Sequence, residues 1–196
     1  MRNKLSTCLI VIGFLLIVLA ILLLSYNAWD DYLAGRKSKK VLDDLTDKIV
    51  IPDEPSYLIS SEVEMPTVNV DNNRYIGVLN LVPLGIKLPI ISDYSYEKMR
   101  IAPVRYKGSV YLDNIIIAGH GYVSHFKNIK YLKVGDQITF TDMEGNIFKY
   151  EVIKQEIIDQ DDVKKMEDGD WDMTLFTCNF DNSKRITIRL RNITKD

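Results

Sequence analysis

Apolar residues follow one another almost without interruption from Leu5 to Leu24. At a rise of 1.5 Å per residue, a helix of about 20 residues spans a hydrocarbon core of about 30 Å. Arg2 and Lys4 precede this run, and positive residues stay on the cytoplasmic side. We therefore expect residues 1–26 to form a cytoplasmic tip and a single transmembrane anchor in the cell membrane, with the rest of the chain extracytoplasmic. A cleaved signal peptide is the alternative, but no small-residue cleavage site follows closely.

A charged and amphipathic stretch comes next. Its apolar residues recur at roughly helical spacing, at Leu33, Val41, Leu42, Leu45 and Ile49. Prolines then interrupt any regular element, at Pro52, Pro55 and Pro66. The pattern predicts an extracytoplasmic helical stalk and linker over residues 27–70, followed by a catalytic domain over 71–196. We expect the stalk to be a solvated spacer, and the alternative is a helix that packs on the domain or on a partner.

From Tyr75 onward, short segments alternate between apolar and polar residues, which is typical of half-buried strands. The segments that predict strands are 75–81, 86–91, 114–118, 136–142, 146–153, 173–177 and 186–190. Short helices are expected over 94–99 and 124–133. Many short strands with few helices predict a mainly β fold, a closed antiparallel β-barrel of about eight strands with short helices.

The composition agrees with one globular domain and gives no reason to expect a nucleic acid partner. Of the 196 residues, 27% are charged and 46% are hydrophobic, and the formal net charge is -2. No basic arm or stripe is visible, and a basic surface is what nucleic acid attracts.

Of the two cysteines, only Cys178 lies outside the apolar run, so it cannot pair with Cys8 across the membrane. Cys178 follows a predicted strand and precedes a predicted turn over 179–184, where a thiol can meet a substrate. Arg185 begins the next strand, and a cation near a thiol favours the nucleophilic thiolate. A buried, inert cysteine is the common alternative. A lone thiol in an exported domain instead points to a reactive group.

Both histidines lie in one short segment, Gly119-His120-Gly-Tyr-Val-Ser-His125. His120 stands between two glycines at the end of an apolar strand, which suits a cleft, and histidine can transfer protons near neutral pH. His125 is expected to be structural or on the surface. Together with Cys178 the two histidines are zinc-type ligands, but no paired spacing such as C-x-x-C accompanies them, so we expect no metal site.

Acidic residues gather between the last predicted strands. They are Asp159, Asp161, Asp162, Glu167, Asp168 and Asp170. Their oxygens suit calcium, but their spacing matches no ligand pattern. We expect a solvated acidic loop over 159–172 and no cofactor, with modulation by Ca²⁺ through this loop as the alternative.

Three motifs resemble those of bacterial sortases. Thr174-Leu-Phe-Thr-Cys178 is similar to the family's Thr-Leu-x-Thr-Cys signature, and Ile117-Ala-Gly-His120 matches its histidine motif. Arg185-Ile-Thr-Ile188 resembles the strand that carries the family's active-site arginine. The resemblance covers roughly residues 75–193, with the three motifs in the family's order, and it implies that His120, Cys178 and Arg185 are catalytic.

The resemblance implies a membrane-anchored cysteine transpeptidase on the outer face of a Gram-positive-type cell. Its substrates would be secreted proteins with a C-terminal LPxTG-type sorting motif, cleaved between Thr and Gly through a thioester on Cys178. His120 would protonate the departing amine and later deprotonate the incoming one, which an amino group of a cell-wall precursor or pilin supplies. Arg185 would stabilise negative charge or hold the peptide's carbonyl oxygens.

Residues next to these motifs are expected to bind the substrate, namely Ala118, Thr177 and Asp172. The resemblance also implies that the acidic loop shapes substrate specificity. The alternative from another class is a catalytically silent, membrane-anchored β-barrel that binds peptides or assembles at the cell surface.

Arg189 is the alternative to Arg185 as the arginine that acts at the active site. Only six residues separate Cys178 from Arg185, whereas Arg189 lies four residues later on the same strand face. At about 3.3 Å per residue, Arg189 is about 13 Å further from the turn. We therefore expect Arg189 to be a surface residue whose change to lysine alters kcat/KM by less than about fivefold.

Overall fold

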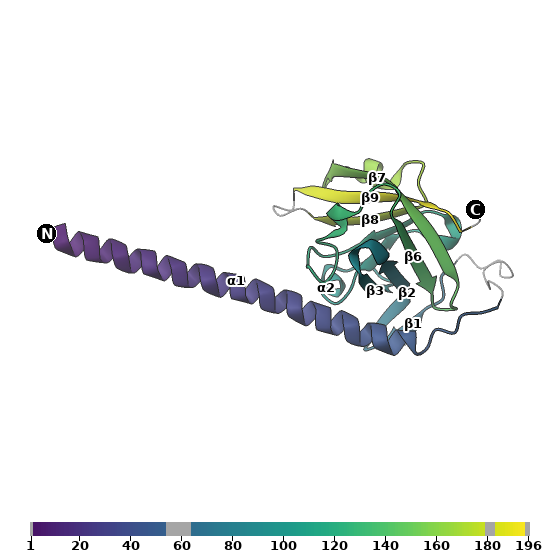
Figure 1. The fold of residues 1–196 in the computed structure, drawn as a ribbon, viewed down its shortest axis with the longest axis horizontal. Helices are drawn as coiled ribbons and strands as arrows, with labels where there is room; N and C mark the ends of the chain where they lie inside the picture. The colour runs from purple at the N-terminus through teal and green to yellow at the C-terminus, as the bar shows by residue number, and fades with distance from the viewer. Residues whose placement is uncertain (1, 54–63, 179–182, 195–196) are drawn as a thin grey trace. The chain divides into compact units, whose positions relative to one another are not determined.

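The computed structural model describes residues 2–53, 64–178 and 183–194 of the chain (Figure 1). The helices are α1 (Arg2–Thr46), α2 (Tyr96–Met99) and α3 (Val163–Glu167), and the 3-10 turns are η2 (Val82–Leu84), η3 (Val110–Leu112) and η4 (Ile129–Tyr131). The strands are β1 (Val68–Val70), β2 (Asn73–Leu81), β3 (Ile86–Ile91), β4 (Val104–Lys107), β5 (Ile115–Ala118), β6 (Gln137–Asp142), β7 (Ile147–Asp159), β8 (Met173–Cys178) and β9 (Lys184–Asn192). Most of the predicted turn after Cys178, residues 179–182, lies outside the described residues.

Eight of these strands close into a barrel, as the sequence predicts. The order is β2-β3-β4-β5-β8-β9-β7-β6, and β2 also pairs with β6, which closes the ring (Figure 1). The short strand β1 adds to β2. A closed barrel leaves no long open edge for pairing with another chain.

The barrel is mixed, so the prediction that it is antiparallel was wrong. β3 pairs with β4 in parallel, and β5 pairs with β8 in parallel. Parallel neighbours need a long crossover connection rather than a tight turn. Between β5 and β8 the chain supplies one, because η4, the β6–β7 hairpin and α3 all lie there.

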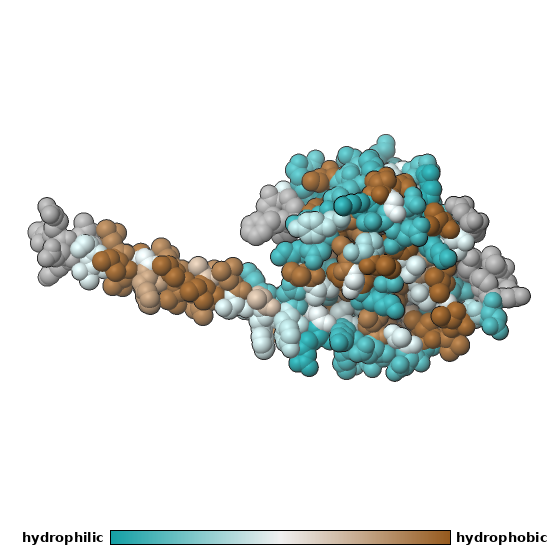
Figure 2. Space-filling view, viewed as in Figure 1, coloured by the Kyte–Doolittle hydropathy of each residue, from teal (hydrophilic) through white to brown (hydrophobic). Residues whose placement is uncertain are grey.

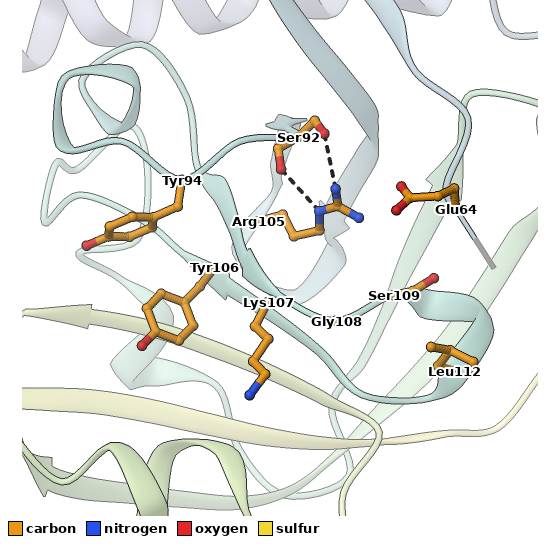
Figure 3. A pocket seen from close by; sticks show the side chains of 9 residues that line it. All are labelled: Glu64, Ser92, Tyr94, Arg105, Tyr106, Lys107, Gly108, Ser109 and Leu112. Carbon is orange, nitrogen blue, oxygen red and sulfur yellow. Dashed lines mark hydrogen bonds between the residues drawn. The ribbon is translucent and has the colours of Figure 1, made fainter.

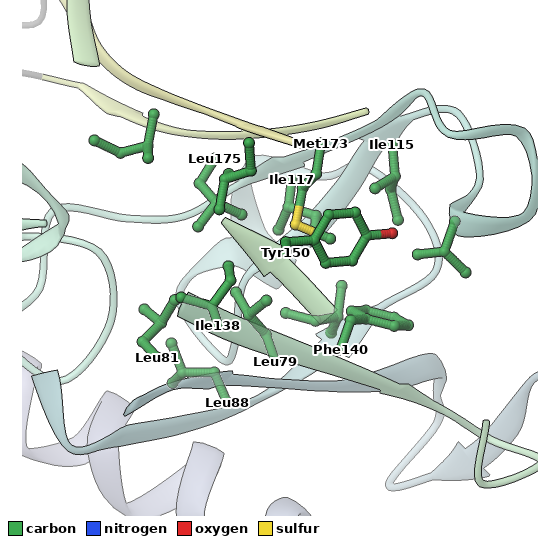
Figure 4. Close-up of a cluster of buried hydrophobic side chains, with 14 of the residues drawn as sticks. Leu79, Leu81, Leu88, Ile115, Ile117, Ile138, Phe140, Tyr150, Met173 and Leu175 are labelled. Atoms are coloured by element: carbon green, nitrogen blue, oxygen red, sulfur yellow. The ribbon is translucent and has the colours of Figure 1, made fainter. Parts of the chain in front are cut away.

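The barrel interior is a continuous apolar cluster (Figure 4). Leu79, Phe140 and Leu175 are fully buried in it, and they come from β2, β6 and β8. Alternation along these strands puts every second side chain inside, which is the pattern that the sequence showed. The interior packing therefore fixes the register of β8, the strand that ends in Cys178.

The last turns of α1 belong to the compact unit Ala34–Asp196. Val41 and Leu45 are 3% and 0% exposed, and they share a second apolar cluster with Val78 of β2. A Cβ on Gly35 would lie 3.0 Å from Cβ of Ser124, so this part of the helix also approaches the segment after β5. The expectation of a solvated spacer was wrong for residues 34–46, because their apolar stripe covers the barrel.

The unit Met1–Leu33 consists of the first part of α1. Its side chains from Ser6 to Leu24 are mostly exposed and apolar (Figure 2). By length and composition this helix is long and apolar enough to cross a membrane, and it fits a single-pass anchor.

Two local predictions differ from the structure. Residues 124–133 form turns and the short η4 instead of a longer helix, and Phe126 and Ile129 point into the barrel core. β4 is not among the predicted strands, because its alternation is short and carries two charged residues, Arg105 and Lys107.

Candidate active site

Cys178 is the last residue of β8 and is partly buried. It lies directly opposite Arg185 of β9 in the antiparallel register. The guanidinium Nη1 of Arg185 donates to Sγ of Cys178 at 2.5 Å. The structure therefore brings the predicted nucleophile and the predicted arginine into direct contact.

The segment with His120 meets the end of β8. β5 and β8 run in parallel with Ala118 opposite Phe176, and the N–H of Gly119 donates to the carbonyl of Phe176 at 3.0 Å. His120 and Cys178 each follow this pair by two residues. A Cβ on Gly121 would lie 3.8 Å from the carbonyl oxygen of Cys178, so the two segments touch.

Aromatic rings hold the imidazole of His120. The ring of Tyr122 stacks on it with centroids 4.0 Å apart and planes 13° apart, and the ring of Tyr96 lies 5.9 Å away. Gly119 is required next to it, because a Cβ there would come within 2.3 Å of the buried ring of Phe126. This packing fixes the position of His120 after the end of β5.

His125 lies elsewhere. It is fully buried, and its ring meets the edge of the Tyr122 ring at 5.4 Å. It therefore supports the ring on which His120 stacks.

An aromatic row leads from Arg185 of β9 over Phe176 of β8 to Tyr106 of β4. The guanidinium of Arg185 lies 5.5 Å from the ring of Phe176, which meets the edge of the Tyr106 ring at 5.7 Å. The ring of Tyr94 follows at 5.3 Å. A cation over an aromatic face is attracted by the ring quadrupole, so Phe176 helps to place Arg185. Sequence reasoning missed this row, because only the barrel places β4 and β8 on either side of β5.

A pocket of 370 Å³ lies at the other end of this row (Figure 3). Arg105 projects into it, and its Nε and Nη2 donate to the carbonyl and the hydroxyl of Ser92 at 3.1 and 3.2 Å. Tyr94 and Tyr106 form part of the wall. Cys178 is not among the residues that line the pocket, whereas Tyr94 and Tyr106 belong both to its wall and to the aromatic row.

The three expected substrate-binding residues lie in different places. Ala118 is fully buried in β5, and Thr177 is 2% exposed next to Cys178. Asp172 precedes β8 at the end opposite to Cys178, and its carboxylate accepts the N–H of Asn192 at 2.6 Å. The structure therefore brings Ala118 and Thr177 to the site but not Asp172.

The expectation of a surface residue was wrong for Arg189, which is fully buried. Its Nε donates to Glu156 at 3.0 Å, and its Nη1 donates to the hydroxyl of Thr174 at 2.8 Å. Nη1 also donates to the carbonyl of Met166 at 2.9 Å, and Nη2 donates to that of Lys165 at 2.6 Å. Arg189 faces outward from β9 like Arg185, but α3 covers it.

The pair of Arg189 and Glu156 is ionised. Burial alone would raise the pKa of the Glu156 carboxyl, but hydrogen bonds and charge from Lys154 and Arg189 bring that pKa below its ordinary value. Burial lowers the pKa of the Arg189 guanidinium, which the bond to Glu156 opposes. A guanidinium stays charged at any physiological pH, so the carboxylate has a permanent cationic partner.

Three acidic residues of the 159–172 stretch each have a different partner. Asp162 caps α3 by accepting the N–H of Lys165 at 3.0 Å, Glu167 pairs with Lys107 of β4, and Asp170 pairs with Arg191 at 3.0 Å. Within the described ranges, no three His, Cys, Asp or Glu side chains come together as a set that can hold a metal ion.

Comparisons with known proteins show what this chain is similar to. A family model of the sortase domain matches residues 79–192. The chain is 28% identical over 107 residues to sortase D of Bacillus subtilis (strain 168), over 52% of this chain and 53% of that protein. It thus spans about half the length of this curated relative.

Solved structures share the fold. The Clostridium perfringens sortase D5 transpeptidase superposes with a TM-score of 0.62 at 22% identity, over 81% of this chain and 99% of that one. Sortase C1 of Streptococcus agalactiae superposes with a TM-score of 0.56 at 26% identity, over 65% and 72% of the two chains.

Proposed function

The chain belongs to the sortase family, and from this premise we propose that it is a membrane-anchored cysteine transpeptidase with Cys178, His120 and Arg185 as its catalytic residues. The observation that carries the proposal is the contact between Arg185 and Cys178 at paired strand ends, beside the segment with His120. A thiol, a cation and an imidazole at one site are the groups that acyl transfer through a thioester needs.

The reaction proceeds in two steps, acylation of Cys178 and transfer of the acyl group to an amine. The sulfur of Cys178 attacks the carbonyl carbon of the motif's threonine, the C–N bond to glycine breaks, and His120 gives a proton to the departing amine. An incoming amine then attacks the thioester, loses a proton to His120 and releases the thiolate. Arg185 donates hydrogen bonds to the oxygen on which negative charge develops, a preorganised role that favours the transition state.

The substrates are secreted proteins with a C-terminal LPxTG-type sorting motif. The acceptor is an amino group of a cell-wall precursor or of a pilin. Arg2 and Lys4 before the apolar run support a cytoplasmic N-terminus, which puts the barrel on the outer face of the membrane with these substrates.

The test uses the full chain in detergent micelles with an LPxTG-type peptide and no added amine. Intact-mass measurement is expected to show the acyl part of the peptide bound to the protein, and peptide mapping is expected to place it on Cys178. Addition of triglycine is expected to release it as a peptide product.

The two cysteines supply a matched control, because Cys8→Ser leaves the barrel untouched. The adduct is expected in Cys8→Ser and absent in Cys178→Ala. An unmodified protein that binds the peptide without any adduct would overturn the proposal in favour of a catalytically silent, peptide-binding barrel.

A further inference from the structure

The chain folds back on itself after β5, from His120 to Lys127, and we call this stretch the histidine turn. The N–H of Phe126 donates to the carbonyl of His120 at 3.2 Å, and the N–H groups of His125 and Lys127 donate to the carbonyl of Tyr122 at 3.0 Å. Phe126 is fully buried in the barrel core. These backbone hydrogen bonds and this anchor fix the place of Tyr122 relative to His120.

Tyr122 presents the flat face of its ring to the imidazole of His120. The two planes are 13° apart and the centroids 4.0 Å apart. Ring pairs ordinarily lie about 4.5–7 Å apart, so this contact is a close one. Tyr122 is 8% exposed, whereas Tyr96, whose tilted ring lies 5.9 Å from the imidazole, is 61% exposed. The buried ring of Tyr122 therefore limits the movement of the imidazole more than the exposed ring of Tyr96 does.

The ring of Tyr122 has packed neighbours of its own. The fully buried ring of His125 meets it at 5.4 Å with the planes 65° apart, an edge-to-face arrangement that aromatic pairs favour. A Cβ on Gly35 of α1 would lie 3.0 Å from Cβ of Ser124, so the helix packs closely against the same turn. Tyr122 is thus a supported surface rather than a mobile side chain.

A contact through the ring face suits a histidine that transfers protons in both directions. The two imidazole nitrogens carry their protons and lone pairs in the plane of the ring, so a stacked partner blocks neither of them. A neutral imidazole gains from stacking, and the ring quadrupole of a tyrosine attracts a cation, so the contact serves both protonation states. A catalytic group that is displaced by about 1 Å can lose about a hundredfold in rate.

We propose that Tyr122 is a positioning residue, which holds the imidazole of His120 by its face in the place that both proton transfers need. The inference rests on the proposed function. Tyr122 takes no part in the covalent steps and acts through His120.

The experiment compares Tyr122→Leu, which removes the ring face, with Tyr122→Phe, which keeps it. Both are made in the full chain, in micelles and in a Cys8→Ser background. Tyr131→Leu is the matched control, because Tyr131 also follows β5, in η4, but is 62% exposed. We measure kcat and KM with an LPxTG-type peptide and triglycine, the rate of adduct formation without amine, and the rate at which triglycine releases the adduct.

A spectroscopic measurement reports the stack itself. The chain has two histidines, so protein labelled with ¹³C at histidine Cε1 and made without a histidine tag gives two resonances, which His120→Gln assigns. The Hε1 proton of His120 lies over the Tyr122 ring, whose ring current displaces its resonance from the position in an unstructured peptide. That displacement is expected to disappear in Tyr122→Leu and to remain in Tyr122→Phe.

In Tyr122→Leu, kcat is expected to fall at least about tenfold while KM stays within about threefold, because the chemistry is impaired and binding is kept. Adduct formation and adduct release are both expected to slow, since His120 transfers a proton in each. Tyr122→Phe is expected to keep kcat within about threefold, because the ring face remains. Tyr131→Leu is expected to stay within about twofold in every rate.

Four outcomes would overturn the proposal. A wild-type kcat in Tyr122→Leu would show that the stack does not matter for the reaction. Equal losses in Tyr122→Leu and Tyr122→Phe would assign the effect to the hydroxyl. Slowing of only one of the two steps would show that Tyr122 does not act through His120. A higher KM with an unchanged kcat would place Tyr122 in substrate binding.

A second variant covers the case in which Tyr122→Leu does not fold. Tyr122→Met removes the ring with a flexible side chain that fills irregular gaps, and the same loss of kcat is expected. A wild-type kcat in Tyr122→Met would then overturn the proposal. Failure of the unmodified protein to form any adduct would instead contradict the proposed function, while the His120 resonance would still decide whether Tyr122 holds the imidazole.

Discussion

The two ends of the strand pair β8–β9 carry the same kind of residue in opposite circumstances. Arg185 at one end is partly exposed and has Cys178 and the ring of Phe176 as its neighbours. Arg189 at the other end is fully buried and uses its donors on protein acceptors. A guanidinium with solvent access can turn toward a substrate, whereas one that is fully engaged can only hold structure. The surroundings of an arginine, rather than its strand face, therefore determine its role.

The largest effect is expected at the thiol itself. Cys178→Ala removes the proposed nucleophile and is expected to abolish thioester and product formation. The free energy of unfolding is expected to change by less than about 0.5 kcal/mol, because a side chain at the end of a strand contributes little packing. Mass spectrometry and chemical denaturation check the two statements. Residual product from this variant would assign the nucleophile to another residue.

Arg185→Lys tests the end of the strand pair at which Cys178 lies. Lysine keeps the charge but loses the forked donors, so kcat/KM is expected to fall by about a hundredfold, the scale of one lost oxyanion donor. Peptide kinetics measure it, with Arg191→Lys of the same strand as the control. A smaller loss than that of Arg189→Lys would reverse the roles assigned to the two ends.

Glu156→Gln tests the buried end through pH. The native pKa of Glu156 is below its ordinary value, so its carboxylate stabilises the fold above that ordinary pKa, and this contribution disappears as the pH falls through the native value. At pH 7 the free energy of unfolding of Glu156→Gln is expected to be lower by about 2 kcal/mol. The Glu156 side chain is only 10% exposed, and its neutralisation leaves Arg189 without a counter-charge.

The pH dependence separates this effect from simple loss of packing. Denaturation between pH 7 and pH 3 is expected to show the stability of the two proteins converging as the pH falls. A constant difference across that range would contradict an ionised pair.

Two threonines of β8 give the smallest effects. Thr174→Val removes an acceptor from Arg189 and is expected to cost about 1 kcal/mol. In the part of the chain that the structure describes, the buried hydroxyl of Thr177 has no hydrogen-bond partner, so Thr177→Val is expected to cost less than about 0.5 kcal/mol. Urea denaturation measures the free energy of unfolding of both variants. An equal loss in Thr174→Val and Thr177→Val would contradict the difference between the two ends of β8.

Local sequence patterns predicted most strands and the ends at which the site lies. The hairpins of β2 with β3 and of β6 with β7 follow from alternation with turn residues between. Cys178 was predicted to be the nucleophile from its place at a strand end and from a motif. Both signals are local, so a single sequence carries them.

The contacts between segments far apart in the chain could not be predicted from such local patterns. Alternation is identical in parallel and antiparallel strands, so nothing local told that β8 runs parallel to β5. Arg189 has the pattern of an exposed residue, because its burial depends on α3, a helix of five residues inside an acidic stretch. The spacing of Val41 and Leu45 predicted a helix but could not name the barrel as its partner.

The parallel pairing of β5 with β8 also sets the order of assembly. The strands that end before His120 and at Cys178 are separated by η4, β6, β7 and α3, and such non-local pairings form slowly because loop closure precedes any gain. β8 is also held between β5 and β9, the last strand. A chain that lacks β9 therefore leaves β8 without one of its two neighbours, so we expect its thiol and its imidazole to stay apart until β9 has been synthesised.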